Sequence, residues 1–440
     1  MGVLIQAFYW DCPNDQSQSW WDYLKTKMEG LSKQGFSAIW LPPASKGYPS
    51  SSMGYSPYDY YDFGEFNQKG SIPTWFGSKR QLLDLIKEIH NHQMQVYADL
   101  VINHNSGADY EEINPIDGKT RWTKFNPASG KFNRDWSCFH PSYYETWDEH
   151  TFGEMPDLCH RNPHVYSELI EYAQYLLDKI GFDGFRYDFV LGYGGWMARA
   201  IQELRTLRNG KALKPYGVGE CWENIRTIDD WLNETNSFTD NPVGAFDFPL
   251  RDKLKNLCDT FGFSLKQLTS GDTLVSQRPG SAVTFAENHD IVRINGIIND
   301  KMLAYSVILT HEGYPCVFWQ DYFNWNLGLE GQKSGIAELV KVHEANAGGT
   351  TNVLYVDDNL YIMQRVGSGD QKGLVYVLNN RGDAWNGAGV VTNWKNTKFV
   401  PAAWRGRNDI NTPQHVVADS NGWGQFWAPP RGYVVYTPQS

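Results

Sequence analysis

Between residues 3 and 345, short apolar runs alternate with stretches whose apolar residues recur at helical spacing. Short runs bounded by turn residues are typical of buried strands. They cover residues 3–10, 36–41, 96–104, 181–190, 217–221, 245–248, 282–287 and 316–319. The helical stretches include 21–31, 78–89, 163–180, 196–208, 225–232, 251–258, 301–310 and 335–345. Eight strands that alternate with helices predict an α/β fold, a (β/α)8 TIM barrel.

Two parts of the chain depart from this alternation. Residues 105–161 are rich in Asn, Asp, Gly, Pro and Trp, and an irregular stretch of that length indicates a small domain inserted after the third strand. From residue 353 onward the pattern changes to short strands separated by turn residues, at 353–356, 360–363, 374–378 and 433–436. We therefore predict a barrel domain (1–103 and 161–347), an inserted domain (104–160) and a C-terminal all-β domain, a β-sandwich (348–440).

Composition narrows the class of partner. The 440 residues carry a net charge of −11 and no basic run, which argues against nucleic acid. Eighteen Trp, 25 Tyr and 22 Phe make 15% of the chain aromatic. Because aromatic faces stack on sugar rings, this favours a carbohydrate ligand, with a large aromatic core as the alternative. No apolar run approaches the ~18 residues of a membrane helix, so we expect no membrane partner.

The N-terminus and the cysteines bear on the cellular compartment. Met1 is followed almost directly by a strand-like run, without the charged and apolar regions of a signal peptide. We expect a secreted protein whose signal peptide is absent from this sequence, with a cytoplasmic protein as the alternative. Six Cys without a CxxC pair are too few for a disulfide framework, so the redox compartment stays open. We expect a monomer.

Charged and polar residues gather at the predicted strand ends. Arg186 and Asp188 lie two apart on one strand and point to the same side, where the cation keeps the carboxylate ionised. Alone, such a pair is most simply a structural ion pair. In a barrel, however, the carboxyl ends of the strands share one rim. The residues expected there are Asp99, Asn103, His104, Arg186, Asp188, Glu220, His289 and Asp290.

This cluster suits acid-assisted cleavage of a glycosidic bond. Asp188 beside Arg186 would stay ionised, and Glu220, in apolar and negatively charged surroundings, would hold a proton near neutral pH. Carboxyl groups about 5–5.5 Å apart would give retention through a covalent glycosyl-enzyme. Asp290 would bind sugar hydroxyls and support the transition state.

Five motifs carry a family resemblance. They read DLVINH at 99–104, GFRYD at 184–188, GECW at 219–222, ENHD at 287–290 and MPDLC at 155–159. In order and strand context they resemble the conserved regions of the α-amylase family of glycoside hydrolases, over essentially the whole chain. The pattern is most similar to the archaeal-type and plant-type calcium-dependent α-amylases. The resemblance implies a nucleophile, Asp188, an acid/base, Glu220, a transition-state stabiliser, Asp290, and substrate contacts from Tyr55, His104, Arg186, Trp222 and His289.

The resemblance also implies metal ions. The family's calcium site, which joins the inserted domain to the barrel, would take Asn103, Asp148 and Asp157 with the backbone carbonyls of His150 and Gly192. Archaeal relatives hold zinc beside this calcium. Here His140 and Cys159 match the zinc ligands, but Glu145 stands where those relatives have a second His, so zinc would need a carboxylate ligand. Leu191 is a second departure, because many α-amylases have at this position a Lys that contacts the substrate.

The expected activity is endo-acting, retaining hydrolysis of internal α-1,4-glucosidic bonds in starch, glycogen and maltooligosaccharides. One alternative is a maltooligosaccharide-specific hydrolase or a transglycosylase of the same family. Another is a non-catalytic carbohydrate-binding protein on the same scaffold, although such proteins usually lose catalytic carboxylates and all three are present here. The tryptophans near the C-terminus either include a second sugar-binding platform or belong to the core: Trp385, Trp394, Trp404, Trp423 and Trp427.

Overall fold

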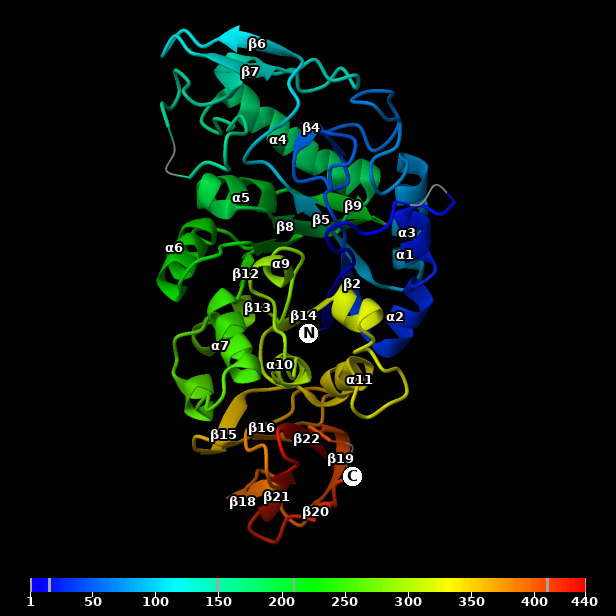
Figure 1. The fold of residues 1–440 in the computed structure, drawn as a ribbon, viewed down its shortest axis with the longest axis vertical. Coiled ribbons are helices and arrows are strands. Elements are labelled where there is room, and N and C mark those ends of the chain that lie inside the picture. The colour runs from blue at the N-terminus through cyan, green and yellow to red at the C-terminus, as the bar shows by residue number, and fades with distance from the viewer. Residues whose placement is uncertain (1, 15–16, 148–149, 209, 409–410, 440) are drawn as a thin grey trace. The chain divides into compact units, whose positions relative to one another are not determined.

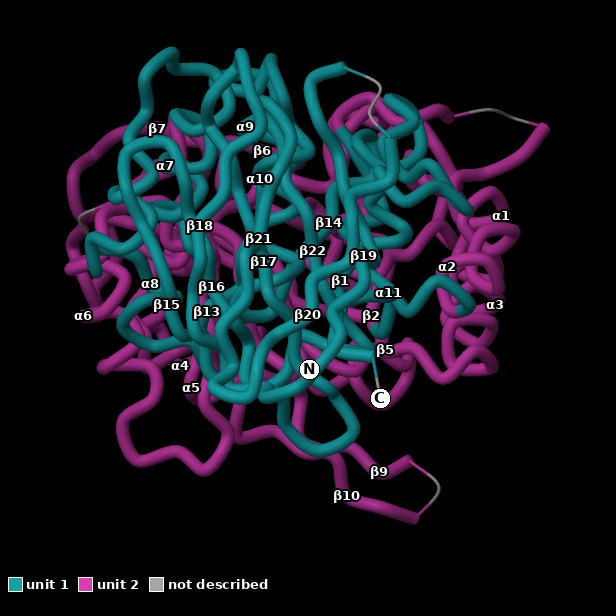
Figure 2. The backbone as a smooth tube through the Cα atoms, turned by 90° about the horizontal axis from the view of Figure 1, so that it is seen from below, with its two compact units in different colours: residues 1–9, 33–37, 247–440 teal, residues 10–32, 38–246 magenta. Residues whose placement is uncertain are grey.

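The computed structural model describes residues 2–14, 17–147, 150–208, 210–408 and 411–439. The chain divides into two compact units, coloured separately in Figure 2. Unit 1 comprises residues 1–9, 33–37 and 247–440, and unit 2 comprises residues 10–32 and 38–246. The division crosses the chain several times, so each unit combines segments that are distant in sequence.

A closed barrel of parallel strands forms in the described part of the chain, with the strand order β1-β14-β13-β12-β11-β8-β5-β2. Its strands are β1 (Val3–Gln6), β2 (Phe36–Trp40), β5 (Gln95–Leu100), β8 (Gly184–Tyr187), β11 (Tyr216–Gly219), β12 (Gly244–Phe246), β13 (Ala282–Phe285) and β14 (Tyr314–Phe318). Nearly every residue of these strands is buried. The predicted TIM barrel is thereby confirmed.

Helices follow the strands as the alternation predicts (Figure 1). They are α1 (Trp20–Lys25), α2 (Met28–Gln34), α3 (Lys79–Asn91), α4 (Pro163–Tyr175), α5 (Gly195–Gln202), α6 (Ile225–Thr235), α7 (Phe248–Asp259), α8 (Leu274–Gln277), α9 (Ile291–Asn295), α10 (Met302–Ile308) and α11 (Ile336–Asn346). Local sequence sets their ends. Ser78 and Gln81 form a capping box at the start of α3. Asn162 caps α4, which begins with a proline and leads through a wider turn (Leu176–Ile180) to Gly181 in the left-handed conformation.

The segment between β5 and α4 is irregular, as expected for an insertion. It contains the hairpin of β6 (Tyr110–Ile113) and β7 (Thr120–Lys124). Isolated bridges pair His104 with Asp157 and Phe139 with Leu158, so the end of this segment returns to the residues that follow β5. Two short strands, β3 (Lys46–Gly47) and β4 (Pro57–Asp59), pair in the loop after β2.

The C-terminal residues form the predicted all-β region. One sheet has the order β15-β16-β17-β22-β19-β20, and β18 pairs with β21 in a second sheet. The strands are β15 (Thr351–Val356), β16 (Leu360–Arg365), β17 (Leu374–Asn379), β18 (Asn386–Val391), β19 (Lys398–Arg405), β20 (Val416–Val417), β21 (Trp423–Ala428) and β22 (Gly432–Gln439). Both sheets contribute to one apolar core, which includes Val377, Val390, Phe426 and Val434.

Two helix predictions were wrong. The helix expected over 21–31 is two helices, α1 and α2. The helix expected over 196–208 ends with α5 at Gln202, and a hairpin of β9 (Thr206–Arg208) and β10 (Lys211–Leu213) follows. Four C-terminal strands, β18, β19, β20 and β21, were not predicted. Within the described residues, no helix combines the length and apolar character needed to cross a bilayer.

Candidate active site

Arg186 is the centre of a buried cluster of carboxylates. Its Nη1 lies 2.7 Å from Asp99 Oδ1 and 2.5 Å from Asp188 Oδ1, and its Nη2 lies 2.7 Å from Glu220 Oε1. The Arg186 side chain is only 1% exposed, and those of Asp188 and Glu220 are 8% and 10% exposed. One guanidinium therefore binds the predicted nucleophile and the predicted acid/base together, as its planar fork of donors allows.

Parallel strand register brings these residues together. Asp99 on β5 is the direct partner of Arg186 on β8, which also pairs with Val218 on β11. Asp188 and Glu220 immediately follow their strands, where their amides still donate to the neighbouring strands, to Leu100 O at 3.1 Å and to Tyr187 O at 2.9 Å. The predicted convergence at the carboxyl ends of the strands is thus present in unit 2.

Asp99 is the most heavily buried acid of the cluster. It accepts hydrogen bonds from Trp40 Nε1 at 3.1 Å and from Tyr55 Oη at 2.6 Å. Burial raises the pKa of Asp99 to about 7, even though the charge of Arg186 lowers it. Asp99 therefore links Arg186 and Tyr55, because it contacts both.

Phe189 fixes Glu220 from the neighbouring loop. Its backbone is in the left-handed region (φ 44°, ψ 56°), which is strained for a residue with a Cβ. In this conformation its amide donates to Glu220 Oε2 at 3.2 Å. Both carboxylate oxygens of Glu220 are therefore held, one by Arg186 and one by a strained backbone amide. No sequence motif pointed to Phe189.

Tyr55 and His104 form a second part of the site in unit 2. The Tyr55 ring stacks on Trp10 at 5.9 Å between ring centroids. His104 Nε2 lies 2.9 Å from the Tyr55 carbonyl oxygen, and the imidazole stacks on Phe152 at 4.5 Å and 9°. The His104 side chain is fully buried, and its Nδ1 has no hydrogen-bond partner among the described residues. The predicted substrate contacts Tyr55 and His104 therefore touch each other.

His289 and Asp290 belong to unit 1. His289 Nδ1 lies 2.8 Å from Gln6 Nε2, its Nε2 lies 3.2 Å from Asp290 Oδ2, and its ring packs on Phe8 at 4.9 Å. The first strand of the chain thus positions this histidine, and neither Gln6 nor Phe8 carried a sequence signal for that role. Asp290 remains 32% exposed in its side chain. Trp222, predicted beside the leaving group, is 42% exposed.

The predicted calcium ligands that are described meet the chemical demands of a hard cation. Asn103 is fully buried, yet its Oδ1 and Nδ2 have no hydrogen-bond partner among the described residues, and the same holds for Asp157 Oδ1. A Cβ on Gly192 would lie 1.9 Å from Asn103 Oδ1, so the backbone of Gly192 closely approaches that amide. Orphaned oxygens beside a closely approaching backbone fit Ca²⁺. Asp148 lies outside the described residues, and His150 is exposed.

The predicted zinc ligands also cluster. Ligand atoms of His140, Glu145 and Cys159 all lie within 4.8 Å of one another. His140 Nδ1 lies 2.8 Å from Asp157 Oδ2, which links this group to the calcium ligands. Burial lowers the pKa of His140, but its hydrogen bonds to Asp157 and Cys159 outweigh this and raise the pKa to about 10. A donor set of N, O and S fits Zn²⁺, which would replace the proton on His140.

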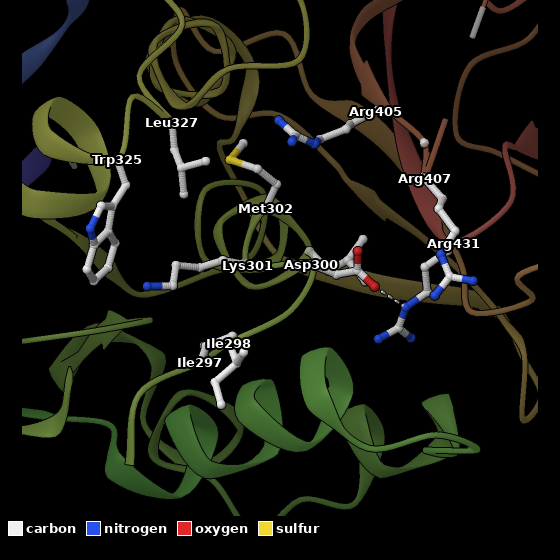
Figure 3. A pocket seen from close by; sticks show the side chains of 12 residues that line it. Ile297, Ile298, Asp300, Lys301, Met302, Trp325, Leu327, Arg405, Arg407 and Arg431 are labelled. Carbon is white, nitrogen blue, oxygen red and sulfur yellow. Dashed lines mark hydrogen bonds and ion pairs between the residues drawn. The ribbon is translucent and has the colours of Figure 1, made fainter. Parts of the chain in front are cut away.

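Two cavities differ in whether candidate site residues line them. A cavity of about 450 Å³ in unit 1 is lined by side chains that include Lys301, Trp325, Arg405 and Arg431 (Figure 3). No candidate catalytic residue lines it, so it is not the reaction site. A cavity of about 410 Å³ in unit 2 is lined by Glu145, His150, Leu191 and Trp196, among others. The departure at Leu191 therefore shares a surface with the candidate metal ligands.

Comparison with known protein families shows which family the chain belongs to. The family profile described as "Alpha amylase, catalytic domain" matches residues 21–326, well over half of the chain. The chain belongs to the α-amylase family. The profile described as "Alpha-amylase C-terminal" matches residues 374–437. The α-amylase family resemblance and the prediction of a glycoside hydrolase are both confirmed.

Individual α-amylase relatives span nearly the whole chain. A "Glucan 1,4-alpha-maltohexaosidase" from Bacillus sp. (strain 707) is 29% identical and covers 97% of this chain and 90% of its own. An "Alpha-amylase" from Geobacillus stearothermophilus is 29% identical and covers 100% of this chain and 87% of its own. The crystal structure of an α-amylase from Geobacillus thermoleovorans, complexed with acarbose, covers 100% and 98% with a TM-score of 0.69. At 18% identity, that last likeness shows the fold alone.

Proposed function

We propose that this member of the α-amylase family is an endo-acting, retaining α-amylase that hydrolyses internal α-1,4-glucosidic bonds in starch, glycogen and maltooligosaccharides. The observation that carries the proposal is the contact of Arg186 with both Asp188 and Glu220. Two carboxylate oxygens on one guanidinium favour the spacing of about 5–5.5 Å that retaining enzymes use over the wider spacing of inverting enzymes.

The reaction assigns one task to each carboxyl group. The Asp188 carboxylate attacks C1 of the glucosyl residue while the Glu220 carboxyl gives its proton to the glycosidic oxygen, which leaves as the hydroxyl of the departing chain. The resulting ester joins C1 to Asp188. Glu220, now ionised, takes a proton from water, whose oxygen attacks C1 and restores Asp188 as the free carboxylate. Two inversions at C1 leave the product in the α-configuration.

The remaining predicted residues are assigned supporting roles. Tyr55 offers its ring to one face of the reacting sugar, and His104 and His289 donate hydrogen bonds to its hydroxyls. Asp290 binds hydroxyls more strongly as positive charge develops at the ring, and so stabilises the transition state. Trp222, being exposed, lines the leaving-group side.

Two metal sites accompany this proposal. Ca²⁺ would be held by Asn103, Asp148 and Asp157 with the carbonyls of His150 and Gly192, and would fix the insertion to the residues after β5. The orphaned oxygens of Asn103 and Asp157 support it. Zn²⁺ would be held by His140, Glu145 and Cys159, supported by their clustering. Secretion, a monomeric state and the predicted domain boundaries stay predictions.

A second candidate function has two observations in its favour. One full-length relative is named a maltohexaosidase, and Leu191 stands where many α-amylases have a substrate-binding Lys. Such an enzyme would use the same carboxylates but release one preferred oligosaccharide. Product length, rather than the reaction itself, separates the two candidates.

The test is incubation with soluble starch, followed by proton NMR of the anomeric signals and by chromatography of the products. An endo-acting α-amylase releases a range of α-configured oligosaccharides early, whereas a single dominant oligosaccharide would identify the second candidate. Early β-anomers would refute retention. Asp188→Asn and Glu220→Gln should each abolish cleavage while near-UV circular dichroism stays unchanged, and residual activity above a few per cent of wild type would exclude the assigned roles.

A further inference from the structure

The structure separates the tryptophans of the C-terminal region into two groups. Trp394 and Trp404 are partly buried and pack against the apolar core. Trp385, Trp423 and Trp427 instead leave 41%, 48% and 42% of their surfaces exposed. Two of the exposed tryptophans, Trp423 and Trp427, lie on β21 and are not part of the apolar core.

Strand alternation places Trp423, Gln425 and Trp427 on one face of β21. Phe426 and Ala428, which alternate with them along the strand, are fully buried in the core, so the tryptophans face away from it. Residues four apart on a strand are separated by about 13 Å. The three side chains form an uncharged row of indole, amide and indole, which we call the β21 platform.

Glycines on the neighbouring strand let the indoles lie flat. In the β18–β21 pairing, Gly387 lies opposite Trp427 and Gly389 opposite Gln425. A Cβ on Gly387 would come within 2.7 Å of the Trp427 ring, and one on Gly389 within 2.6 Å of the Trp423 ring. Each indole therefore rests on a backbone that has no side chain, with its other face outward. Contact with glycine also stabilises the pairing of β18 with β21, which is the competing, purely structural explanation.

We propose that the β21 platform is a second, non-catalytic binding site for an α-glucan chain. The inference rests on the proposed function, whose substrate it would hold. Flat indoles match the apolar faces of pyranose rings, the Gln425 amide offers both a donor and an acceptor to sugar hydroxyls, and no charge on these three side chains calls for an ionic partner. The Trp423 ring lies over Gly389 and the Trp427 ring over Gly387, so the two indoles are closer together than the ~13 Å between their Cα atoms, and neighbouring glucose residues of one chain can contact both.

The test is adsorption of the whole protein to granular starch in the cold, with kcat/KM on soluble maltoheptaose measured in parallel. Trp423→Ala/Trp427→Ala should adsorb about tenfold more weakly, the effect of losing roughly 1.4 kcal/mol of stacking, with maltoheptaose hydrolysis unchanged. The double Phe variant keeps flat rings and should retain most of the adsorption. Phe261→Ala removes a fully exposed aromatic ring elsewhere in unit 1 and should adsorb like wild type.

Several outcomes would overturn the platform. Unchanged adsorption of the double Ala variant would do so, as would a parallel loss of adsorption and of maltoheptaose hydrolysis, because a folding defect affects both. Equal thermal destabilisation of the Ala and Phe variants with full adsorption would leave only the structural explanation. If light scattering showed self-association that the double Ala variant lost while starch adsorption stayed intact, the face would be a protein interface. If the wild-type protein did not cleave maltoheptaose, the proposed function would be refuted. The β21 platform would still be tested, because adsorption to starch is measured separately.

Discussion

Replacing Arg186 with Met tests the electrostatic centre of the site most directly. Met has a similar length and no charge, so the substitution removes three ionic contacts while filling most of the volume. Leaving a buried carboxylate without its partner costs about 3–5 kcal/mol. At the proposed spacing of about 5–5.5 Å and an effective dielectric constant near 20, two carboxylates repel by roughly 3 kcal/mol, which gives a figure of the same size. We expect R186M to lose at least about 3 kcal/mol of unfolding free energy, a large share of a typical 5–15 kcal/mol.

The kcat of R186M should fall by more than the loss of folded protein can explain. Arg186 contacts both the proposed nucleophile and the proposed acid/base, and removing a preorganised electrostatic group of this kind costs about 10²–10³ in kcat. Arg186→Lys should recover part of the stability but little of the rate, because one ammonium cannot replace two separate nitrogens. Urea unfolding followed by tryptophan fluorescence gives the free energy, and initial rates on maltoheptaose give kcat.

Arg365→Met supplies the matched control. Arg365 is also buried, but it donates to the carbonyl oxygens of Gly349 and Thr310 and binds no carboxylate among the described residues. Its loss should destabilise unit 1 and leave kcat of the folded enzyme intact. If R186M kept a rate within about tenfold of wild type, or if the two variants lost activity equally, Arg186 would not be the group that organises the reactive carboxylates.

Three further predictions concern the metals and the pH dependence. Gly192→Ala should reduce the rise in melting temperature that CaCl₂ gives over EDTA, because a Cβ would occupy the position of Asn103 Oδ1; an undiminished calcium shift would contradict the assigned site. Cys159→Ser should lower the zinc content measured by mass spectrometry after metal loading, and equal content in both proteins would exclude the cluster. Asp99 has a pKa raised to about 7, so its contribution to stability is full below its ordinary value of 3.8 and is lost as pH rises through about 7. Asp99→Asn should abolish that loss, up to about 4 kcal/mol, in urea titrations across the window, whereas parallel pH profiles would refute the buried, titrating Asp99.

The barrel could be predicted because its strands are short apolar runs bounded by turn residues. Two of the C-terminal strands, β18 and β19, could not be predicted, for reasons visible in their sequences. Strand β18 has glycines at two of its six positions, which hide its alternation, and β19 contains Pro401 beside a bulge in its pairing with β22. Of the hairpin β9–β10, only β9 falls within the predicted helix 196–208, and β10 lies beyond it and was not predicted.

The convergence of the candidate carboxylates could be predicted because they occupy motifs at strand ends. The residues that hold the candidate site residues in place could not. Gln6 reaches His289 from the other end of the chain, and Phe189 acts through a backbone amide that any residue possesses. Contacts of this kind depend on tertiary placement and on φ, neither of which a side-chain pattern encodes. Likewise, only the pairing with glycines separates the exposed tryptophans of β21 from those that fill the core.

The pairing of β1 with β14 sets the order of events during synthesis. In this parallel pairing, Leu4 lies opposite Cys316 and Gln6 lies opposite Phe318. At 5–20 residues per second, roughly 300 residues of translation separate the two strands, so β1 waits about 15–60 s on the ribosome before its partner emerges. Until then His289 has no Gln6 fixed in place, and an apolar strand edge stays open to wrong partners. Closure of the barrel therefore has to wait for β14, its last strand in the sequence, and slow translation or truncation before β14 should leave a chain that aggregates rather than one that is merely inactive.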